Sequence, residues 1–539
     1  MPSFLVLILI LPLVGAVGTF ALALVPRLRS YAYYVALGAI LPTTILVLIL
    51  RWMGPKIDVP VLWRPSLLFG ATPMLQNDAA LQPLAFALAL ATSLTVLVAL
   101  SRQDRLRPQI LAVLLVLLPP SFVALWSANP LTIVAGWAIY DLVLAAGHIA
   151  ASGWDRTAIR GLVFGGLATL LLWGGTLLSV GEGESSLWGL MTPSDAQLAL
   201  WTAAGVLRLW IYPFHLAAPA GYDSSPSLVP FLMSPVLGWG LCLRLVSING
   251  GSFPGGAWVL TLAALTLSLG GLLAWSSKSP RAMLPWISME VTGAVLLAAV
   301  LAGDNASIVI SSGCVAWTLG TMVLFSTDGL RLEAPWWNIP ALIGALTLLG
   351  LPFTLGFSSQ SALLGGIARG GHLWWGAAFF FGNIFLVASL ARWLLAPSSS
   401  PRLSRYWQMA VYGAGLGVAA LLLLISGLYR GLLVGGVTFP SLGTLFATPG
   451  LAGWLVWVIS LALGGVLAWQ EGNVRDRIEF LLDAVHDFLR LEWLYDVVVG
   501  AMDRGLGAIR AADEVVGGAG ALLWSLLLFL LLLLIWTSR

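Results

Sequence analysis

Six ionisable side chains lie inside long apolar stretches of this sequence: Asp141, His148, Arg208, His215, Arg244 and Glu290. Within a bilayer, a charged side chain costs at least about 2.5 kcal/mol at mid-depth, so it usually has a partner or a function. Carboxyl and imidazole groups can gain and lose protons, whereas arginine stays protonated in proteins. These residues therefore each need a partner or a function inside the membrane.

The six residues differ in how deeply they lie within their apolar stretches, and so in how strongly they imply a partner or a function. Arg244 is near one end of its apolar stretch and can extend to the membrane surface, and His148 is close to a polar segment at 154–156. Asp141 and Arg208 are the most deeply placed acid and base, and pairing is the least costly arrangement for two buried charges. We therefore predict an Asp141–Arg208 pair. The candidates for a proton path or ion pair are Asp141, Arg208, His215 and Glu290.

The stretch 207–219, "LRLWIYPFHLAAP", places two prolines at membrane depth. Because proline interrupts a helix, we predict breaks at Pro213 and Pro219. Such breaks are tolerated in a membrane only where the freed backbone lines a cavity or packs in protein. A similar Pro-Phe pair occurs in "LPFTLGFS" at 351–358, which predicts another break at Pro352. Breaks in matching positions of two halves are typical of transporters.

The amino-acid composition indicates that membrane-spanning helices position these residues. The chain has 539 residues, of which 59% are hydrophobic and 9% are charged, whereas a soluble domain carries about 25% charged residues. It is therefore predicted to be an all-α polytopic membrane protein, and no strand pattern is present. A formal charge of +3 gives no indication of nucleic-acid binding. Cys242 and Cys314 form no metal-ligand spacing, so we expect no metal and no redox cofactor.

Sixteen apolar runs are near the roughly 20 residues that a helical span needs. They lie at 3–25, 31–51, 82–101, 109–127, 130–152, 158–179, 197–214, 226–248, 255–275, 282–302, 306–326, 338–357, 372–396, 407–428, 451–470 and 521–537. The two Pro-Phe breaks fall in spans 7 and 12, five spans apart. This spacing predicts two five-helix repeats, spans 4–8 and 9–13, and an odd number of spans per repeat makes them inverted.

The spans divide the chain into six predicted parts. They are the N-terminal spans (1–108), the first repeat (109–248), the second repeat (249–397), spans 14 and 15 (398–470), an amphipathic segment (471–520) and a C-terminal span (521–539). Loops after odd-numbered spans, up to the thirteenth, hold thirteen Arg and Lys residues, and loops after even-numbered spans hold five. By the positive-inside rule, the N-terminus is predicted to face outward and 471–520 to be cytoplasmic, in the cell membrane.

Four stretches resemble the antiporter-like, proton-channel membrane subunits of respiratory complex I, a family with relatives in Mrp antiporters and membrane-bound hydrogenases. The stretches are "SANPLTIVAGWAIYDL" (127–142), "RLWIYPFHLAAPAGYDSSPSLVPFLMSPVLGWGLCLR" (208–244), "KSPRAMLPWISMEVTG" (278–293) and "LLGLPFTLGFSSQSALL" (348–364). The resemblance implies a proton path in which a glutamate of span 5 pairs with a lysine of span 7. The path then continues through titratable residues of spans 8, 11 and 12.

The sequence departs from that pattern at nearly every path position. Ala138 stands at the glutamate position, with Asp141 three residues later on roughly the same helix face. Arg208 replaces the lysine of span 7. The remaining path positions hold Val236 in span 8, Cys314 as the one ionisable residue of span 11, and Gln360 in span 12. The resemblance therefore implies a retained fold with a degenerate proton path.

The resemblance predicts a membrane-arm subunit of a complex-I-like NADH:quinone oxidoreductase or a related proton-translocating complex. Its expected partners are other membrane-arm subunits and lipids, and not nucleic acid. Two alternatives stay open. One is a purely structural subunit of the same family, which the missing titratable residues favour. The other is an independent secondary transporter for a small solute.

Overall fold

The computed structural model describes residues 4–54, 57–58, 72–102, 107–152, 156–178, 187–217, 228–327, 330, 335–370, 373–397, 403, 405–434, 438–497, 499–501, 504, 507 and 525–531. The chain divides into two compact units, Met1–Leu482 and Asp483–Arg539. The first unit holds the helices described below. Of the predicted last span, 521–537, only 525–531 are described, and they are helical.

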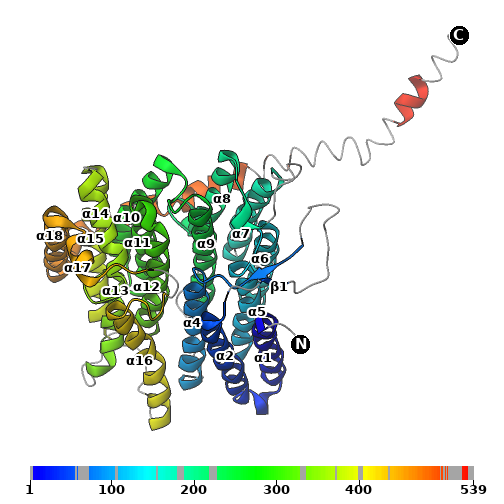
Figure 1. Ribbon diagram of the computed structural model, residues 1–539, viewed down its shortest axis with the longest axis horizontal. Helices are drawn as coiled ribbons and strands as arrows, with labels where there is room; N and C mark the ends of the chain where they lie inside the picture. The colour runs from blue at the N-terminus through cyan, green and yellow to red at the C-terminus, as the bar shows by residue number, and fades with distance from the viewer. Residues whose placement is uncertain are drawn as a thin grey trace. The chain divides into compact units, whose positions relative to one another are not determined.

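The first unit is built almost entirely of helices that stand side by side (Figure 1). The α-helices are α1 (Phe4–Leu24), α2 (Tyr31–Ile49), α4 (Gln82–Ser101), α5 (Pro108–Leu125), α6 (Pro130–Ser152), α7 (Arg156–Leu177), α8 (Asp195–Arg208), α9 (Leu228–Ile248), α10 (Gly256–Ser276), α11 (Leu284–Leu301), α12 (Ala306–Ser326), α13 (Ile339–Leu348), α14 (Phe357–Gly370), α15 (Leu373–Leu395), α16 (Tyr406–Leu428), α17 (Leu442–Ala447) and α18 (Gly450–Trp469). A further helix, α19 (Glu471–Leu489), begins in this unit and crosses its boundary.

Short 3-10 helices and one small sheet connect these elements. The 3-10 helices are η1 (Pro26–Leu28), η2 (Leu50–Trp52), η3 (Trp188–Leu190), η4 (Phe214–Ala217), η6 (Arg281–Met283), η7 (Gly303–Asn305) and η8 (Pro335–Asn338). Strand β1 (Ile57–Asp58) pairs antiparallel with β2 (Leu75–Gln76), so that Ile57 lies opposite Gln76. The expectation of no strands was wrong on this point, because strands of two residues are too short to produce a periodic sequence pattern.

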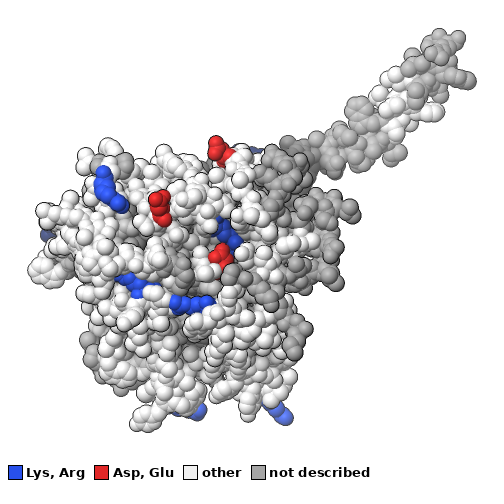
Figure 2. Space-filling view, viewed as in Figure 1, with Lys and Arg blue, Asp and Glu red and all other residues white. Residues whose placement is uncertain are grey.

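The helices confirm the predicted fold class. Each of the first fifteen predicted spans contains a helix, and twelve helices in the described part of the chain are long and apolar enough to cross a membrane. Charged side chains are sparse on the face shown in Figure 2, as expected of a surface that contacts lipid. The total of sixteen spans, the division into six parts and the inverted repeats stay predictions.

Three buried helices, α4, α9 and α12, pack against one another. In Figure 1 they lie between α1, α2, α5, α6 and α7 on one side and α14, α15, α17 and α18 on the other. Helix α8 packs on both α7 and α9, and helix α13 packs on α12. The short helices α8 and α13 are the elements that the two Pro-Phe pairs follow.

The two helix interruptions have similar local causes. Helix α8 ends at Arg208, and Pro213 lies in the gap before η4. Helix α13 ends at Leu348, and Pro352 lies in the gap before α14. In the second gap Gly350 has φ +64°, a conformation that L-residues rarely adopt. Pro213 and Pro352 have no backbone N–H, so neither can donate a helical hydrogen bond in its gap. The third predicted break, Pro219, lies outside the described residues.

Candidate functional site

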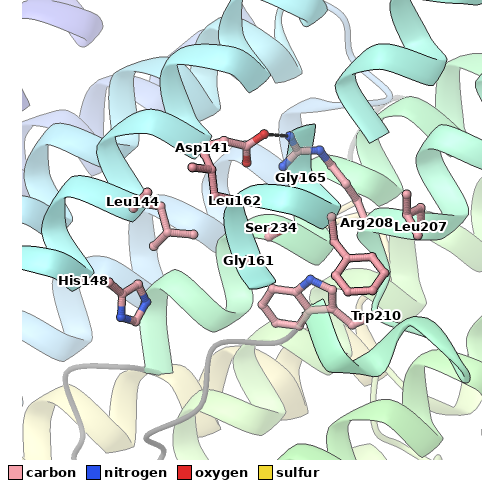
Figure 3. Close-up of a pocket in the computed structure, with 12 residues that line it drawn as sticks. Asp141, Leu144, His148, Gly161, Leu162, Gly165, Leu207, Arg208, Trp210 and Ser234 are labelled. Carbon is pink, nitrogen blue, oxygen red and sulfur yellow. Dashed lines mark hydrogen bonds and ion pairs between the residues drawn. The ribbon is translucent and has the colours of Figure 1, made fainter. Parts of the chain in front are cut away.

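An ion pair joins α6 to the end of α8. Nη2 of Arg208 lies 2.5 Å from Oδ2 of Asp141, as the dashed line in Figure 3 shows. The Arg208 side chain is 2% exposed and that of Asp141 is 8% exposed. At this separation and burial the two groups form a charge-assisted hydrogen bond, which is stronger than a bond between neutral groups. The structure thus brings together the acid and the base that the sequence places deepest.

Helix α8 presents Arg208 at its last residue. Ser194 begins the helix with a capping box, in which its hydroxyl accepts from the Gln197 backbone N–H and the Gln197 side chain accepts from the Ser194 backbone N–H. Beyond Arg208 the backbone leaves the helix, and Trp210 has φ +54°. Since cations are favoured at the C-terminal end of a helix, the break itself stabilises the positive charge of Arg208.

Three further residues surround the pair. The Thr169 hydroxyl on α7 donates to the Gly165 carbonyl at 3.0 Å and lies 3.3 Å from Arg208 Nη2 and 3.4 Å from Asp141 Oδ2. The guanidinium carbon of Arg208 is 4.1 Å from the centre of the Trp137 ring, in a cation–π contact. A Cβ at Gly165 would lie 2.7 Å from the Asp141 carboxyl carbon, so glycine is what lets α7 approach the carboxylate.

These contacts do not satisfy all the hydrogen-bond donors of the Arg208 guanidinium. Nε and Nη1 of Arg208 are buried and have no hydrogen-bond partner among the described residues. The face of Trp137 covers part of the cation, but the charge depends on Asp141 for its one anionic contact in the described structure. Loss of the carboxylate would therefore leave a buried cation without a counter-ion, which is strongly destabilising.

A small cavity opens beside the pair and is lined by residues of α6, α7, α8 and α9. Besides Asp141 and Arg208 its lining includes His148, Trp210 and Ser234. His148 is seven residues, or two helical turns, after Asp141, so both lie on one face of α6. In Figure 3 the imidazole lies apart from the ion pair, with Leu144 between His148 and Asp141. The arrangement places two groups that can exchange protons, Asp141 and His148, on one cavity whose other lining residues are mostly apolar.

The other two predicted path residues have surroundings of their own. His215 lies in η4, where its ring stacks on Tyr212 at 5.2 Å and tilts toward Trp286 at 5.2 Å. Glu290 lies on α11 and is 2% exposed. Its Oε2 has no hydrogen-bond partner among the described residues. Of the four predicted residues, the described contacts join only Asp141 and Arg208.

The glycines of α10 define the niche of Glu290. A Cβ at Gly270 would meet the Glu290 backbone at 2.8 Å, and a Cβ at Gly271 would lie 2.9 Å from the carboxyl Oε2. The backbone carbonyl of Gly382 on α15 is equally close to that position, at 2.7 Å. Glu290 therefore fills a closely packed space between α10, α11 and α15, whereas Asp141 borders a cavity.

Arg244 differs from the expectation that it extends to the membrane surface. It is 5% exposed, donates from Nη2 to the Leu125 carbonyl at 2.8 Å, and lies 4.0 Å from an Asp78 carboxylate oxygen. The ring of Trp188 is 5.9 Å from its guanidinium carbon. The side chain reaches protein groups at the end of α5 instead of lipid, because the loop before α4 supplies an acid there.

The remaining path positions are neutral and buried. Val236 on α9 and Cys314 on α12 are fully enclosed, and Gln360 on α14 is 8% exposed. The Nε2 of Gln360 has no hydrogen-bond partner among the described residues. Sequence reasoning missed Thr169, Trp137 and Gly165, because threonine, tryptophan and glycine are common in membrane helices and gave no signal that distinguished them.

Comparisons with known proteins agree with this fold. No protein-family model matches the chain. It is 26% identical over 252 residues to NADH-quinone oxidoreductase subunit N of Xanthomonas euvesicatoria, a match that covers 41% of this chain and 52% of the relative. It is 24% identical over 315 residues to F(420)H(2) dehydrogenase subunit N of Methanosarcina mazei, covering 50% of this chain and 64% of the relative. The chain thus spans about half the length of the first relative.

Two solved structures have the same fold over nearly the whole chain. A chain of the Mrp complex from Dietzia sp. superposes with a TM-score of 0.77 at 19% identity, covering 98% of this chain and 62% of that one. A chain of the membrane-bound sulfane sulfur reductase, an archaeal respiratory membrane complex, superposes with a TM-score of 0.69 at 18% identity, covering 99% of this chain and all of that one. At these identities the likeness establishes the fold.

The apolar helices and the structural likeness define a multi-pass membrane protein, built almost entirely of helices, with the fold of a chain of the Mrp complex. The chain is thus similar in sequence to the N subunits of NADH-quinone oxidoreductase and F(420)H(2) dehydrogenase, and similar in fold to chains of the Mrp and sulfane sulfur reductase complexes, which agrees with the resemblance found in its sequence.

Proposed function

We propose that this chain is an antiporter-like membrane-arm subunit of a complex-I-like NADH:quinone oxidoreductase or a related proton-translocating complex. The observation that carries the proposal is the buried Asp141–Arg208 pair at the end of an interrupted helix, in a fold like that of a Mrp-complex chain. Electron transfer belongs to other subunits, and this chain works in the membrane beside them.

In this proposal Asp141 is the group that changes charge. Arginine stays protonated in proteins, so Arg208 is a fixed positive charge. When Asp141 is ionised the pair is neutral overall, and when Asp141 takes up a proton the local charge becomes positive. A conformational change elsewhere in a complex can favour one state over the other by altering access of water to the cavity that His148 also lines.

The path beyond the pair is degenerate. The positions that carry the second half of the path in related subunits are occupied here by Val236, Cys314 and Gln360, none of which carries a charge at neutral pH. Proton transfer through this chain would therefore need hydroxyl groups and water in place of ionisable side chains. The proposal is that Asp141 contributes to proton translocation by its charge state, and not as one member of a continuous series of lysines.

A structural role is the second candidate. The specific observation that favours it is the chemistry of Arg208, which cannot exchange its proton as the lysine of related subunits can. In that case the pair holds α6, α7 and α8 together and the chain spaces its neighbours in the membrane. The independent-transporter alternative receives less support, because the related chains belong to multisubunit complexes.

We further propose that the chain resides in the cell membrane with other membrane-arm subunits and lipids around it, with the N-terminus outside and 471–520 in the cytoplasm. Arg475 at the start of that segment donates to the carbonyls of Trp275, Ser276 and Ser277 at 3.1, 3.0 and 2.5 Å. Helix α19 would then lie at the cytoplasmic ends of α10 and α15, since Arg392 on α15 also pairs with Glu471 at 3.0 Å.

Proton pumping by the purified complex in sealed vesicles tests the proposal. Asp141→Asn is expected to lower the number of protons moved per substrate turnover while turnover by the electron-transfer subunits continues. Asp304→Asn is the control and should leave pumping unchanged, because it neutralises an exposed carboxyl group in η7 that does not line the cavity of the pair. Normal pumping in an intact Asp141→Asn complex would favour the structural role.

A further inference from the structure

An aromatic ring covers the Arg208 guanidinium beside its carboxylate partner, and this ring belongs to Trp137 of α6. The ring centre is 4.1 Å from the guanidinium carbon, and Trp137 is fully buried. The ring of Tyr140 is further from the same carbon, at 5.9 Å. A cation over the face of a tryptophan is attracted by the ring quadrupole, most strongly where water is excluded. Trp137 therefore stabilises the charge of Arg208 in addition to packing against it.

The indole N–H of Trp137 does not explain why a tryptophan lies at this place. Buried tryptophans usually find a hydrogen-bond partner for this group, as Trp201 does with the Leu172 carbonyl at 3.2 Å. The Nε1 of Trp137 is buried and has no hydrogen-bond partner among the described residues. In the described structure, Trp137 thus contacts a polar group through the face of its ring, and that group is Arg208.

The ring and the carboxylate that hold Arg208 come from the same helix face. Asp141 follows Trp137 by four residues, so the two side chains are neighbours on α6. Arg208 contacts both at once, the carboxylate through Nη2 and the ring through the plane of the guanidinium. A guanidinium is planar and delocalised and stacks on aromatic faces, whereas the ammonium of lysine is a compact point charge. Arginine is therefore the cation that can keep a contact with α6 when the carboxylate is neutral.

The contact with the ring does not depend on the charge of Asp141. When the carboxyl group is protonated, the buried cation loses its anionic contact, which is costly. The described contacts that then remain are the Thr169 hydroxyl, 3.3 Å from Nη2, and the ring of Trp137. The hydroxyl lies near Nη2, and Nε and Nη1 have no hydrogen-bond partner among the described residues. The ring therefore compensates the part of the delocalised charge that hydrogen bonds do not reach.

We propose that Trp137 is a positioning residue that holds the Arg208 cation in place when Asp141 is neutral. The arginine then stays at the end of α8 in both charge states of the pair. This inference rests on the proposed function, in which Asp141 changes charge, and it names the group that stabilises the neutral state. Without the ring, Arg208 would depend on an ionised Asp141 at all times. Loss of Trp137 should therefore affect the protein most when the side chain at position 141 carries no charge.

A double-mutant cycle tests the proposal, with Asp141→Asn in place of the protonated carboxyl group. The full chain is purified in mild detergent with its accompanying subunits, and its unfolding by denaturant is measured. Trp137→Leu is expected to lower the folding equilibrium constant about tenfold more in the Asp141→Asn protein than in the unmodified protein. Trp137→Phe keeps an aromatic face and is expected to restore part of this difference, which a leucine of similar apolar character does not.

A fluorinated tryptophan at position 137 separates the charge interaction from packing. Fluorine withdraws electron density from the ring face and leaves the shape of the ring nearly unchanged. It should lower the stability of the Asp141→Asn protein and change that of the unmodified protein little. Trp126→Leu is the matched control, because Trp126 is also fully buried with no partner for Nε1 among the described residues, but its ring stacks on Phe122 at 4.9 Å. Its effect should be the same in both proteins.

Equal losses for Trp137→Leu in the two proteins would overturn the proposal. An Asp141→Asn protein whose stability does not change on fluorination of the ring would overturn it as well. These measurements involve no turnover, so they are separate from the test of the proposed function. Normal proton pumping by an intact Asp141→Asn complex would count against that function, whereas the coupling would still show that the ring holds Arg208 beside a neutral side chain.

Discussion

Replacement of Asp141 by asparagine is expected to destabilise the protein by about 3 kcal/mol. The carboxylate is 2.5 Å from Arg208, and both side chains are nearly fully buried. Removing one partner of a buried ion pair typically costs about 3–5 kcal/mol, because the other charge is left uncompensated. Asparagine still offers an oxygen to Nη2, and the Trp137 ring still covers the cation. We therefore expect a loss at the lower end of that range.

Two further variants make this expectation specific. The double variant Asp141→Asn, Arg208→Gln removes both charges, so it is expected to recover much of the lost stability. Glu290→Gln removes a buried carboxyl group that has no ion-pair partner in the described structure, and it should cost less than Asp141→Asn.

Denaturant unfolding in mild detergent, followed by tryptophan fluorescence, measures these differences, and the yield of the assembled complex provides an independent readout. The reasoning would be refuted if Asp141→Asn unfolded at the same denaturant concentration as the unmodified chain. It would also be refuted if the double variant were less stable than Asp141→Asn, because the uncompensated charge of Arg208 could then not be the cause of the lost stability.

Three other substitutions test the surroundings of the site and of α19. Gly165→Ala places a Cβ 2.7 Å from the Asp141 carboxyl carbon and should lower the free energy of unfolding by about 1–3 kcal/mol through overpacking. Gly166→Ala has open space at its Cβ and should change the free energy of unfolding little in the same assay. Gly350→Ala, at φ +64° and 2.6 Å from Gln360 Cβ, should cost more than 1 kcal/mol, and an unchanged unfolding midpoint would contradict that estimate. Arg475→Gln should free the start of α19 from the end of α10 and increase amide hydrogen exchange there; unchanged exchange would show that these bonds do not hold the helix.

Much of the architecture follows from apolar run length. A run of about 20 apolar residues in lipid must satisfy its backbone internally, so it becomes a helix, and fifteen predicted spans accordingly contain one. The fifteen residues after Leu355 were harder to interpret. Helix α14 there contains Gln360 and several serines, and it forms inside the bundle because the break at Pro352 restarts the chain against α11 and α12. Composition alone does not contain that tertiary information.

The candidate site was predictable in part for a similar reason. Asp141 and Arg208 stand out because a deep charge in an apolar run is rare and costly, so each implies the other. Thr169 and Trp137 carry no such signal, and their contacts with Arg208 depend on how α6, α7 and α8 pack. Arg244 was misjudged because its partner, Asp78, lies 166 residues earlier in the chain, in the loop before α4.

The composition of the complex that contains this chain tests the central claim most directly. The chain would be purified in mild detergent from its native membrane, and the accompanying proteins identified by mass spectrometry. The account predicts other multi-pass subunits of the same antiporter-like class together with subunits that carry redox cofactors. A chain that purifies as a stable monomer and moves a small solute alone in vesicles would contradict it.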